Sequence, residues 1–171
     1  MLLIVPAESQ LQYRKVRELL VELTEWDMSQ VEGLGLDAQG VLDFYYASGD
    51  EALPGEYAPP NGSMLLATYS DKAAGCAAFH RMTPDICEMK RMYVRPEFRR
   101  LRIGRQLADA LIDVAREAGY GVMRLETTTF MDKAIAMYSS LGFRVCDPYY
   151  TIPESFRAIT VFMELELTAV K

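Results

Sequence analysis

YVRPEFRRLRIG, residues 93–104, is the stretch that decides the fold, because it joins the end of a strand to the start of a helix through a cluster of arginines. A helix start leaves about four backbone N–H groups unpaired and carries roughly half a positive charge, so it favours a bound anion. Residues 88–105 include seven basic and two acidic side chains, a local net charge of +5, whereas the whole chain carries −6 and the remainder therefore −11. The segment predicts a site for a phosphorylated small molecule at the helix start.

Size and composition limit the class of protein. A chain of 171 residues that is half hydrophobic fits a single domain over residues 1–171. Three cysteines (Cys76, Cys87 and Cys146) without CxxC or zinc-ligand spacing favour reduced thiols in the cytoplasm and no metal site. The opening MLLIV is too short for a signal peptide or a membrane span, and the confinement of basic residues to one segment argues against nucleic acid.

Elements before the arginine cluster follow from apolar spacing. MLLIV predicts a first strand, and Ser9 with Gln12 forms a capping box for a helix that reaches about Trp26. Residues 29–48 predict one or two short helices, because three glycines weaken their pattern. Residues 49–62 predict a surface loop rich in Pro and Gly, and three strands are expected over residues 63–69, 73–80 and 86–94.

Elements after the cluster alternate between helix and strand. A helix is expected from Ile103 to about Ala118, a strand over residues 122–128, and a shorter helix from Ala134 to Leu141. Strands are then expected over residues 143–146 and 158–167. This order predicts an α/β fold with a sheet and covering helices, and its hydrophobic last strand offers an edge for a homodimer.

Two motifs in this order resemble the GNAT superfamily of acetyl-CoA-dependent N-acetyltransferases. The family's pyrophosphate motif, [RQ]-x-x-G-x-[GA], corresponds to residues 99–104, where Arg102 replaces the usual first glycine. Residues 134–143, AIAMYSSLGF, match the family's A-x-x-x-Y-x-x-L-G-F stretch, while Met131 stands where an asparagine is common. Arg102 either turns outward to a phosphate or distorts the loop, and the first is favoured because the positive charge is kept.

The resemblance implies a mixed, mostly antiparallel sheet of about seven strands flanked by about four helices, which splays near Val94 to hold acetyl-CoA. It implies direct transfer of the acetyl group to a primary amine in a ternary complex. A backbone N–H of Met92 or Val94 would hold the thioester oxygen. The expected cofactor-binding residues are Met92, Tyr93, Val94, Arg99, Arg100, Leu101, Arg102, Ile103, Gly104 and Arg105.

Two side chains are candidates for the chemistry. An amine of pKa near 10.4 must lose its proton at a cost of roughly 4.6 kcal/mol at pH 7. Glu88 is the candidate base, acting through water or with a raised pKa, and strand alternation places it on the same face as Lys90 and Met92. Tyr138 is the candidate hydrogen-bond donor to the departing thiolate.

Other interpretations stay open at this point. Glu88 also fits an ion pair with Lys90 or Arg91, Tyr138 also fits the core, and His80 is expected at a polar rim. Tyr149 and Tyr150 either line the acceptor pocket or pack in a loop. A non-catalytic acyl-CoA-binding module is an alternative that would need the arginines but not Glu88 or Tyr138. The sequence also does not show whether the acceptor is a small-molecule amine or a peptide amine.

Overall fold

The computed structural model describes residues 1–46 and 53–167. Its sheet has seven strands in the order β1-β2-β3-β4-β5-β7-β6. The strands are β1 (Leu2–Pro6), β2 (Ser63–Tyr69), β3 (Lys72–Arg81), β4 (Ile86–Val94), β5 (Val122–Thr128), β6 (Arg144–Val145) and β7 (Thr160–Glu166). All neighbouring strands are antiparallel except β4 and β5, which confirms the mixed, mostly antiparallel sheet.

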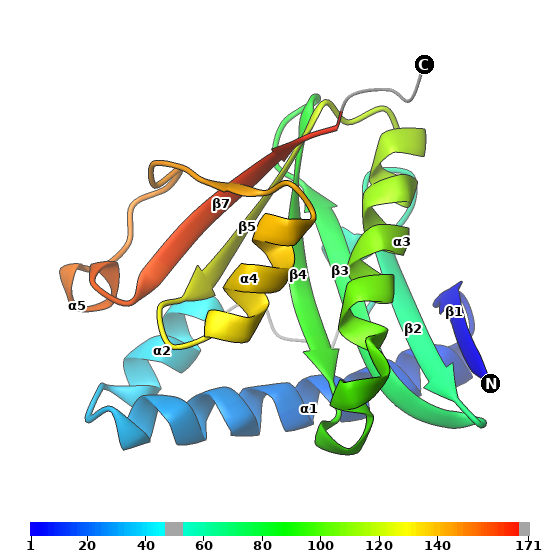
Figure 1. Ribbon diagram of the computed structural model, residues 1–171, viewed down its shortest axis with the longest axis horizontal. Coiled ribbons are helices and arrows are strands. Elements are labelled where there is room, and N and C mark those ends of the chain that lie inside the picture. Colours follow the sequence, from blue (N-terminus) through cyan, green and yellow to red (C-terminus); the bar gives the residue numbers. More distant parts are fainter. Residues whose placement is uncertain (47–52, 168–171) are drawn as a thin grey trace.

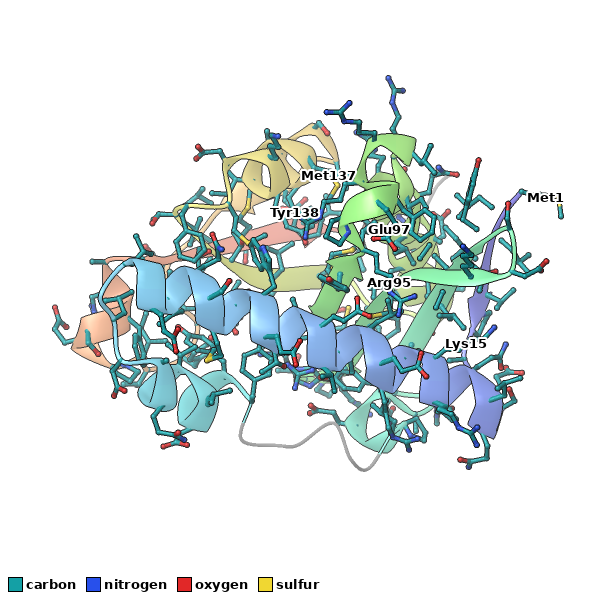
Figure 2. All side chains as sticks on the ribbon, turned by 90° about the horizontal axis from the view of Figure 1, so that it is seen from below. Met1, Lys15, Arg95, Glu97, Met137 and Tyr138 are labelled. Atoms are coloured by element: carbon teal, nitrogen blue, oxygen red, sulfur yellow. The ribbon has the colours of Figure 1, made fainter. Side chains whose placement is uncertain are left out.

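Helices cover both faces of the sheet (Figure 1). They are α1 (Gln10–Gly33), α2 (Ala38–Tyr45), α3 (Ile103–Glu117), α4 (Asp132–Ser140) and α5 (Glu154–Arg157), with 3₁₀ turns η2 (Gly55–Tyr57) and η3 (Pro96–Leu101). Figure 2 shows α1 on the side of the sheet opposite α3 and α4. No helix within the described ranges is long and apolar enough to cross a membrane.

Each face has its own apolar core. Ile103, Leu107 and Leu111 of α3 pack on one face with Met89 and Leu125 of the sheet. On the other face, a second cluster packs α1 against β2 and β3; it includes Val16, Leu19, Leu20, Leu66 and Cys76. The apolar periodicity of α1 and α3 is what fixes the two helices to the two faces.

The first helix differs from its predicted length. The capping box is confirmed, since the Ser9 side chain accepts from Gln12 N and the Gln12 side chain accepts from Ser9 N. The helix continues past Trp26 to Gly33, because Val31 is buried against Val41 of α2 in a third apolar cluster. Of the loop expected over residues 49–62, residues 49–52 lie outside the described residues, and η2 occupies part of the remainder.

The sheet splits where β4 and β5 separate. Their parallel pairing runs from Ile86 opposite Val122 to Met89 opposite Leu125 and then ends, although β4 continues to Val94 and β5 to Thr128. Figure 1 shows the two arrows diverging toward their C-terminal ends. The predicted splay is therefore confirmed, and within residues 1–46 and 53–167 no strand pairs with that edge of β4 beyond Met89.

A bulge in β4 changes which side chains face which core. Arg91 has φ 57°, and the register with β3 shifts between Cys76 opposite Tyr93 and Ala78 opposite Lys90. One β3 residue thus opposes two β4 residues, and the alternation of side chains reverses beyond the bulge. Met92 packs on the α3 side rather than beside Glu88, so the predicted shared face of Glu88 and Met92 is wrong.

Candidate active site in the sheet split

A pocket passes through the split and is lined from both faces of the sheet. From the α3 and α4 side it is lined by Met89, Met92, Leu125 and Tyr138. From the α1 and α2 side it is lined by groups that include Asp27, Val31, Val41, Tyr45, Tyr46 and Glu126. Two reactants that enter from opposite faces would meet between the separated strands.

The arginine segment lies beside one mouth of this split. Arg100 and Arg102 are exposed, whereas Arg105 donates to Asp109 and to the Ser140 hydroxyl, 2.7 Å away. Arg99 donates to the Val94 carbonyl, and its guanidinium lies 5.6 Å from the Trp26 ring centroid. The candidate anion-binding side chains therefore reduce chiefly to Arg100 and Arg102, next to the first N–H groups of α3.

The Arg95 side chain stabilises the fold and is not part of the candidate anion site. Its guanidinium donates to both carboxylate oxygens of Glu22 on α1, at 2.7–3.0 Å, and to the Ala73 carbonyl. Tyr93 also turns to this side, where its hydroxyl is 3.4 Å from Glu22. Only the backbone of Tyr93 remains available to a ligand in the split.

The backbone conformation of Arg102 explains why the family motif usually has glycine at this position. It has φ 57° and ψ 23°, a left-handed conformation that directly precedes α3. A Cβ on Gly104 would meet Val94 and Met137 at 3.6 and 3.8 Å, which are ordinary contacts, so alanine is tolerated there as the motif states. The loop keeps the conformation that glycine usually supplies while a cationic side chain extends outward.

The variant Arg102→Gly should be more stable than the natural protein. Left-handed geometry costs a non-glycine residue about 1–2 kcal/mol, and the added freedom of glycine in the unfolded chain offsets roughly 0.5–1 kcal/mol of the gain. We expect thermal unfolding to shift upward by about 1–4 °C. The control is Arg100→Gly, where the replaced residue has a right-handed conformation. A melting temperature of Arg102→Gly below that of the natural protein would contradict the strain at Arg102.

Glu88 lies in a network of polar partners. Its carboxylate accepts from His80 Nε2 at 2.9 Å and from the Tyr149 hydroxyl at 2.8 Å, and Lys90 Nζ is 3.7 Å away. Burial raises the pKa of Glu88, but His80, Lys90 and Tyr149 together lower it below its ordinary value. Of the two routes expected for Glu88, the lowered pKa disagrees with a raised pKa and leaves action through water as a prediction. Glu88 is not among the described residues that line the pocket.

His80 connects this network to the surface. It pairs with Glu88 across β3 and β4, and its Nδ1 lies 3.5 Å from a carboxylate oxygen of the half-exposed Glu56. The Tyr57 ring meets the imidazole edge-on, with 6.1 Å between centroids. His80 thus lies between the carboxylates of Glu56 and Glu88 and is not among the described residues that line the pocket.

Glu126 is the carboxylate that sequence reasoning missed. It follows Leu125, the last β5 residue paired with β4, and it lines the pocket. Lys90 Nζ donates to its Oε1 at 3.1 Å, while its buried Oε2 has no hydrogen-bond partner within the described residues. Burial raises the pKa of Glu126 above the ordinary glutamate value, although Lys90 opposes the shift. Nothing in the sequence singles it out, because strand alternation places Glu126 on a mixed face with Val122, Arg124 and Thr128.

A second pocket carboxylate comes from α1. Asp27 accepts a hydrogen bond from the Tyr46 hydroxyl. Burial raises the pKa of Asp27, while Tyr46 and the charge of Arg91 act in the opposite direction. The Arg91 guanidinium lies 5.1 Å from the Tyr46 ring centroid, so α1, the residue after α2 and the β4 bulge meet at this wall.

Tyr138 lies on α4 and faces the split, where it lines the pocket (Figure 2). Its ring packs against Phe143 with 5.7 Å between centroids. Burial raises the pKa of its hydroxyl, so the group stays protonated at neutral pH. Burial alone causes this shift, and no hydrogen bond to another described residue contributes to it.

Tyr149 and Tyr150 lie in the loop before α5 and pack against Phe162. The ring centroids of Tyr149 and Phe162 are 4.8 Å apart, and those of Tyr150 and Phe162 are 5.2 Å apart. Neither tyrosine is among the described residues that line the pocket. The described part of the chain holds no group of three or more His, Cys, Asp or Glu side chains arranged to bind a metal.

Comparisons with known proteins agree with this geometry. Residues 21–143 match the family model described as the acetyltransferase (GNAT) family. An uncharacterized N-acetyltransferase of Schizosaccharomyces pombe is 37% identical over 132 residues, which cover 74% of this chain and 79% of the relative.

Solved structures share the fold. An acetyltransferase of the GNAT family from Staphylococcus aureus Mu50 has a TM-score of 0.74 and 20% identity, covering 98% of this chain and 100% of its own. A GNAT family acetyltransferase from Elizabethkingia anophelis, solved with acetyl-CoA bound, has a TM-score of 0.54 and 23% identity, covering 68% and 82% of the two chains. At these identities the likeness shows the fold.

Proposed function

Because the chain belongs to the GNAT acetyltransferase family, we propose that it moves an acetyl group directly from acetyl-CoA to a primary amine in the split between β4 and β5. The observation that carries this proposal is the pocket lined from both faces of the sheet. One face presents the arginine-rich start of α3, and the other presents two carboxylates. Residues 1–171 would act as one catalytic unit.

The residues beside α3 suit the diphosphate of CoA. Arg100, Arg102 and the N–H groups that open α3 supply positive charge and donors. In the part of the chain that the structure describes, no strand pairs with the outer edge of β4 after Met89. The backbone N–H of Met92 or Val94 would donate to the thioester oxygen, which gains negative charge during the transfer. Structures of similar fold, such as the Elizabethkingia enzyme, hold acetyl-CoA.

Glu126 is the group we assign to proton acceptance. It lines the pocket, its Oε2 is unpartnered, and its raised pKa makes it a stronger base than Glu88. Glu88, held by three partners, would position Lys90 against Glu126. Acetyl-CoA supplies the activated acetyl group, and the Tyr138 hydroxyl would donate to the sulfur as it leaves with the electron pair of the broken C–S bond.

The direct test combines calorimetry with acetyl-CoA and a thiol-release assay over a panel of amines and peptides. We expect saturable binding and CoA release that depends on an amine, with the acetylated amine identified by mass spectrometry. Failure to bind acetyl-CoA at millimolar concentration, or binding with no acetylated product from any amine, would contradict the proposal.

The double variant Arg100→Ala with Arg102→Ala should weaken acetyl-CoA binding at least about tenfold. Each substitution removes a charge-assisted phosphate contact worth roughly 1.5 kcal/mol or more. Isothermal calorimetry measures the change. Arg14→Ala with Arg144→Ala is the matched control, because both side chains are exposed and the loss of net charge is equal. Equal weakening in both double variants would show general electrostatics rather than a phosphate site.

A further inference from the structure

The wall of the pocket on the α1 and α2 side is mainly apolar and aromatic. Val31, Val41 and Ile159 line it and belong to a cluster that also packs Phe156 and Tyr45. Leu23, Trp26 and Phe130 line other parts of the same pocket. Such a wall favours binding of the apolar part of an acceptor and offers few groups that offset the loss of water from polar groups.

The charged groups that line the pocket already have partners or balance one another. Two are acidic, Asp27 and Glu126, and two are basic, Lys90 and Arg91. Glu126 accepts from Lys90, while Asp27 accepts from Tyr46 and is influenced by Arg91. The described lining therefore carries no net charge at neutral pH that would attract a polycation. Among the described residues, Glu126 Oε2 remains without a hydrogen-bond partner and is available to a single amine group, as is the buried Thr128 Oγ1 at the end of β5.

Position separates Glu126 and Lys90 from the apolar residues, whereas Asp27 and Arg91 lie with Tyr46 at the α1 and α2 wall. Glu126 and Lys90 are the first residues beyond the last β4–β5 pair, so they flank the point where the strands part. Val31, Val41 and Ile159 come from α1, α2 and the residue before β7. An acceptor with its amine at Glu126 would lay the rest of its structure along this apolar wall.

From these observations, and resting on the proposed function, we infer that the acceptor is a monoamine with an apolar aliphatic or aromatic body, rather than a polyamine or a polar amino sugar. The apolar wall also assists the chemistry. An amine surrounded by apolar groups loses hydration of its charged form and is more readily neutral. The same wall would then bind the body and lower the cost of deprotonation.

A homologous series of amines tests this inference. The probes are linear monoamines from propylamine to hexylamine and diamines of the same lengths, with acetyl-CoA as donor and thiol release as readout. Buried methylene groups contribute about 0.8 kcal/mol each, so kcat/KM should rise about fourfold per carbon for the monoamines. Each diamine should be at least about tenfold poorer than its monoamine, because its second ammonium must lose water against the apolar wall.

A pair of valine variants locates the effect. Val41→Ala should reduce the gain in kcat/KM per methylene, whereas Val21→Ala, an exposed α1 position outside the pocket lining, should leave the series unchanged. Thermal unfolding of both variants checks that the fold is kept. Retention of the full gain in a folded Val41→Ala variant would show that the apolar body lies elsewhere.

The outcomes separate this inference from the proposed function. A flat series, a preference for diamines, or a preference for a peptide N-terminus would overturn the apolar acceptor while leaving acetyl transfer intact. Absence of acetylated product from every amine and peptide would instead contradict the transfer itself. Calorimetric binding of acetyl-CoA, which does not involve the acceptor, is measured in the same preparations.

Discussion

Replacement of Glu126 by Gln should lower kcat/KM for the amine by about 10²–10⁴-fold, the contribution of a well-placed general base. Glutamine keeps the size of the side chain and an oxygen that can accept from Lys90, but it cannot take the amine proton. Steady-state kinetics with a good acceptor measures the loss. Acetyl-CoA affinity should change little, because Glu126 lines the pocket on the side where we propose that the acceptor binds.

Two companion variants sharpen this result. Glu88→Gln should have a smaller effect on kcat, since Glu88 acts on the site through Lys90, and Glu166→Gln, on an exposed part of β7, should have none. If a folded Glu88→Gln protein lost as much activity as Glu126→Gln or more, Glu88 would be the base, as the sequence suggests.

The pH profile gives an independent reading of the same assignment. A base must be unprotonated, so kcat/KM falls as pH falls through its pKa. Burial raises the pKa of Glu126, so if Glu126 is the base, kcat/KM should fall at a pH above the ordinary glutamate pKa. If Glu88, whose pKa is lowered, were the base, kcat/KM would fall at a pH below the ordinary glutamate pKa. Glu126→Gln should remove the acid limb assigned to Glu126.

Replacement of Tyr138 by Phe should lower kcat by about 10²-fold, the lower end of the range for a catalytic acid. The lost hydroxyl is the group that we propose as donor to the departing sulfur, and its high pKa keeps it protonated as a donor. KM for acetyl-CoA should change little. Steady-state kinetics with varied acetyl-CoA separates kcat from KM.

Stability distinguishes this role from packing. No hydrogen bond to another described residue contributes to the raised pKa of Tyr138, so the melting temperature of Tyr138→Phe should stay close to that of the natural protein. Tyr69→Phe, whose ring packs on Phe98 away from the pocket lining, is the control. An unchanged kcat in Tyr138→Phe would make Tyr138 a packing residue only.

Local patterns predicted most of the elements. The α3 helix, the strands over residues 63–69 and 86–94 and the capping box at Ser9 are all present, because each depends on neighbours in the sequence. The end of α1 was missed, since its last turns are stabilised by contact with α2, which helical periodicity does not record. The split near Val94 came from the family resemblance.

The site was less predictable because it depends on contacts between distant segments. Arg95 looks like part of the anion cluster, but it binds Glu22 more than seventy positions away. Glu126 gains its role from Lys90 on a neighbouring strand. The bulge at Arg91 leaves no mark in the apolar pattern, so the face of Met92 was predicted wrongly.

That bulge gives β4 one residue more than its ladder with β3 needs. Deleting Arg91 would leave Lys90, Met92 and Tyr93 opposite Ala78, Ala77 and Cys76 in an unbroken ladder, with Met92 and Tyr93 still on their present faces. Deleting Met92 as well would exchange the two faces beyond that point, so that Tyr93 would be driven under α3 and its hydroxyl would leave Glu22. Loss of one residue here should therefore be tolerated far better than loss of two.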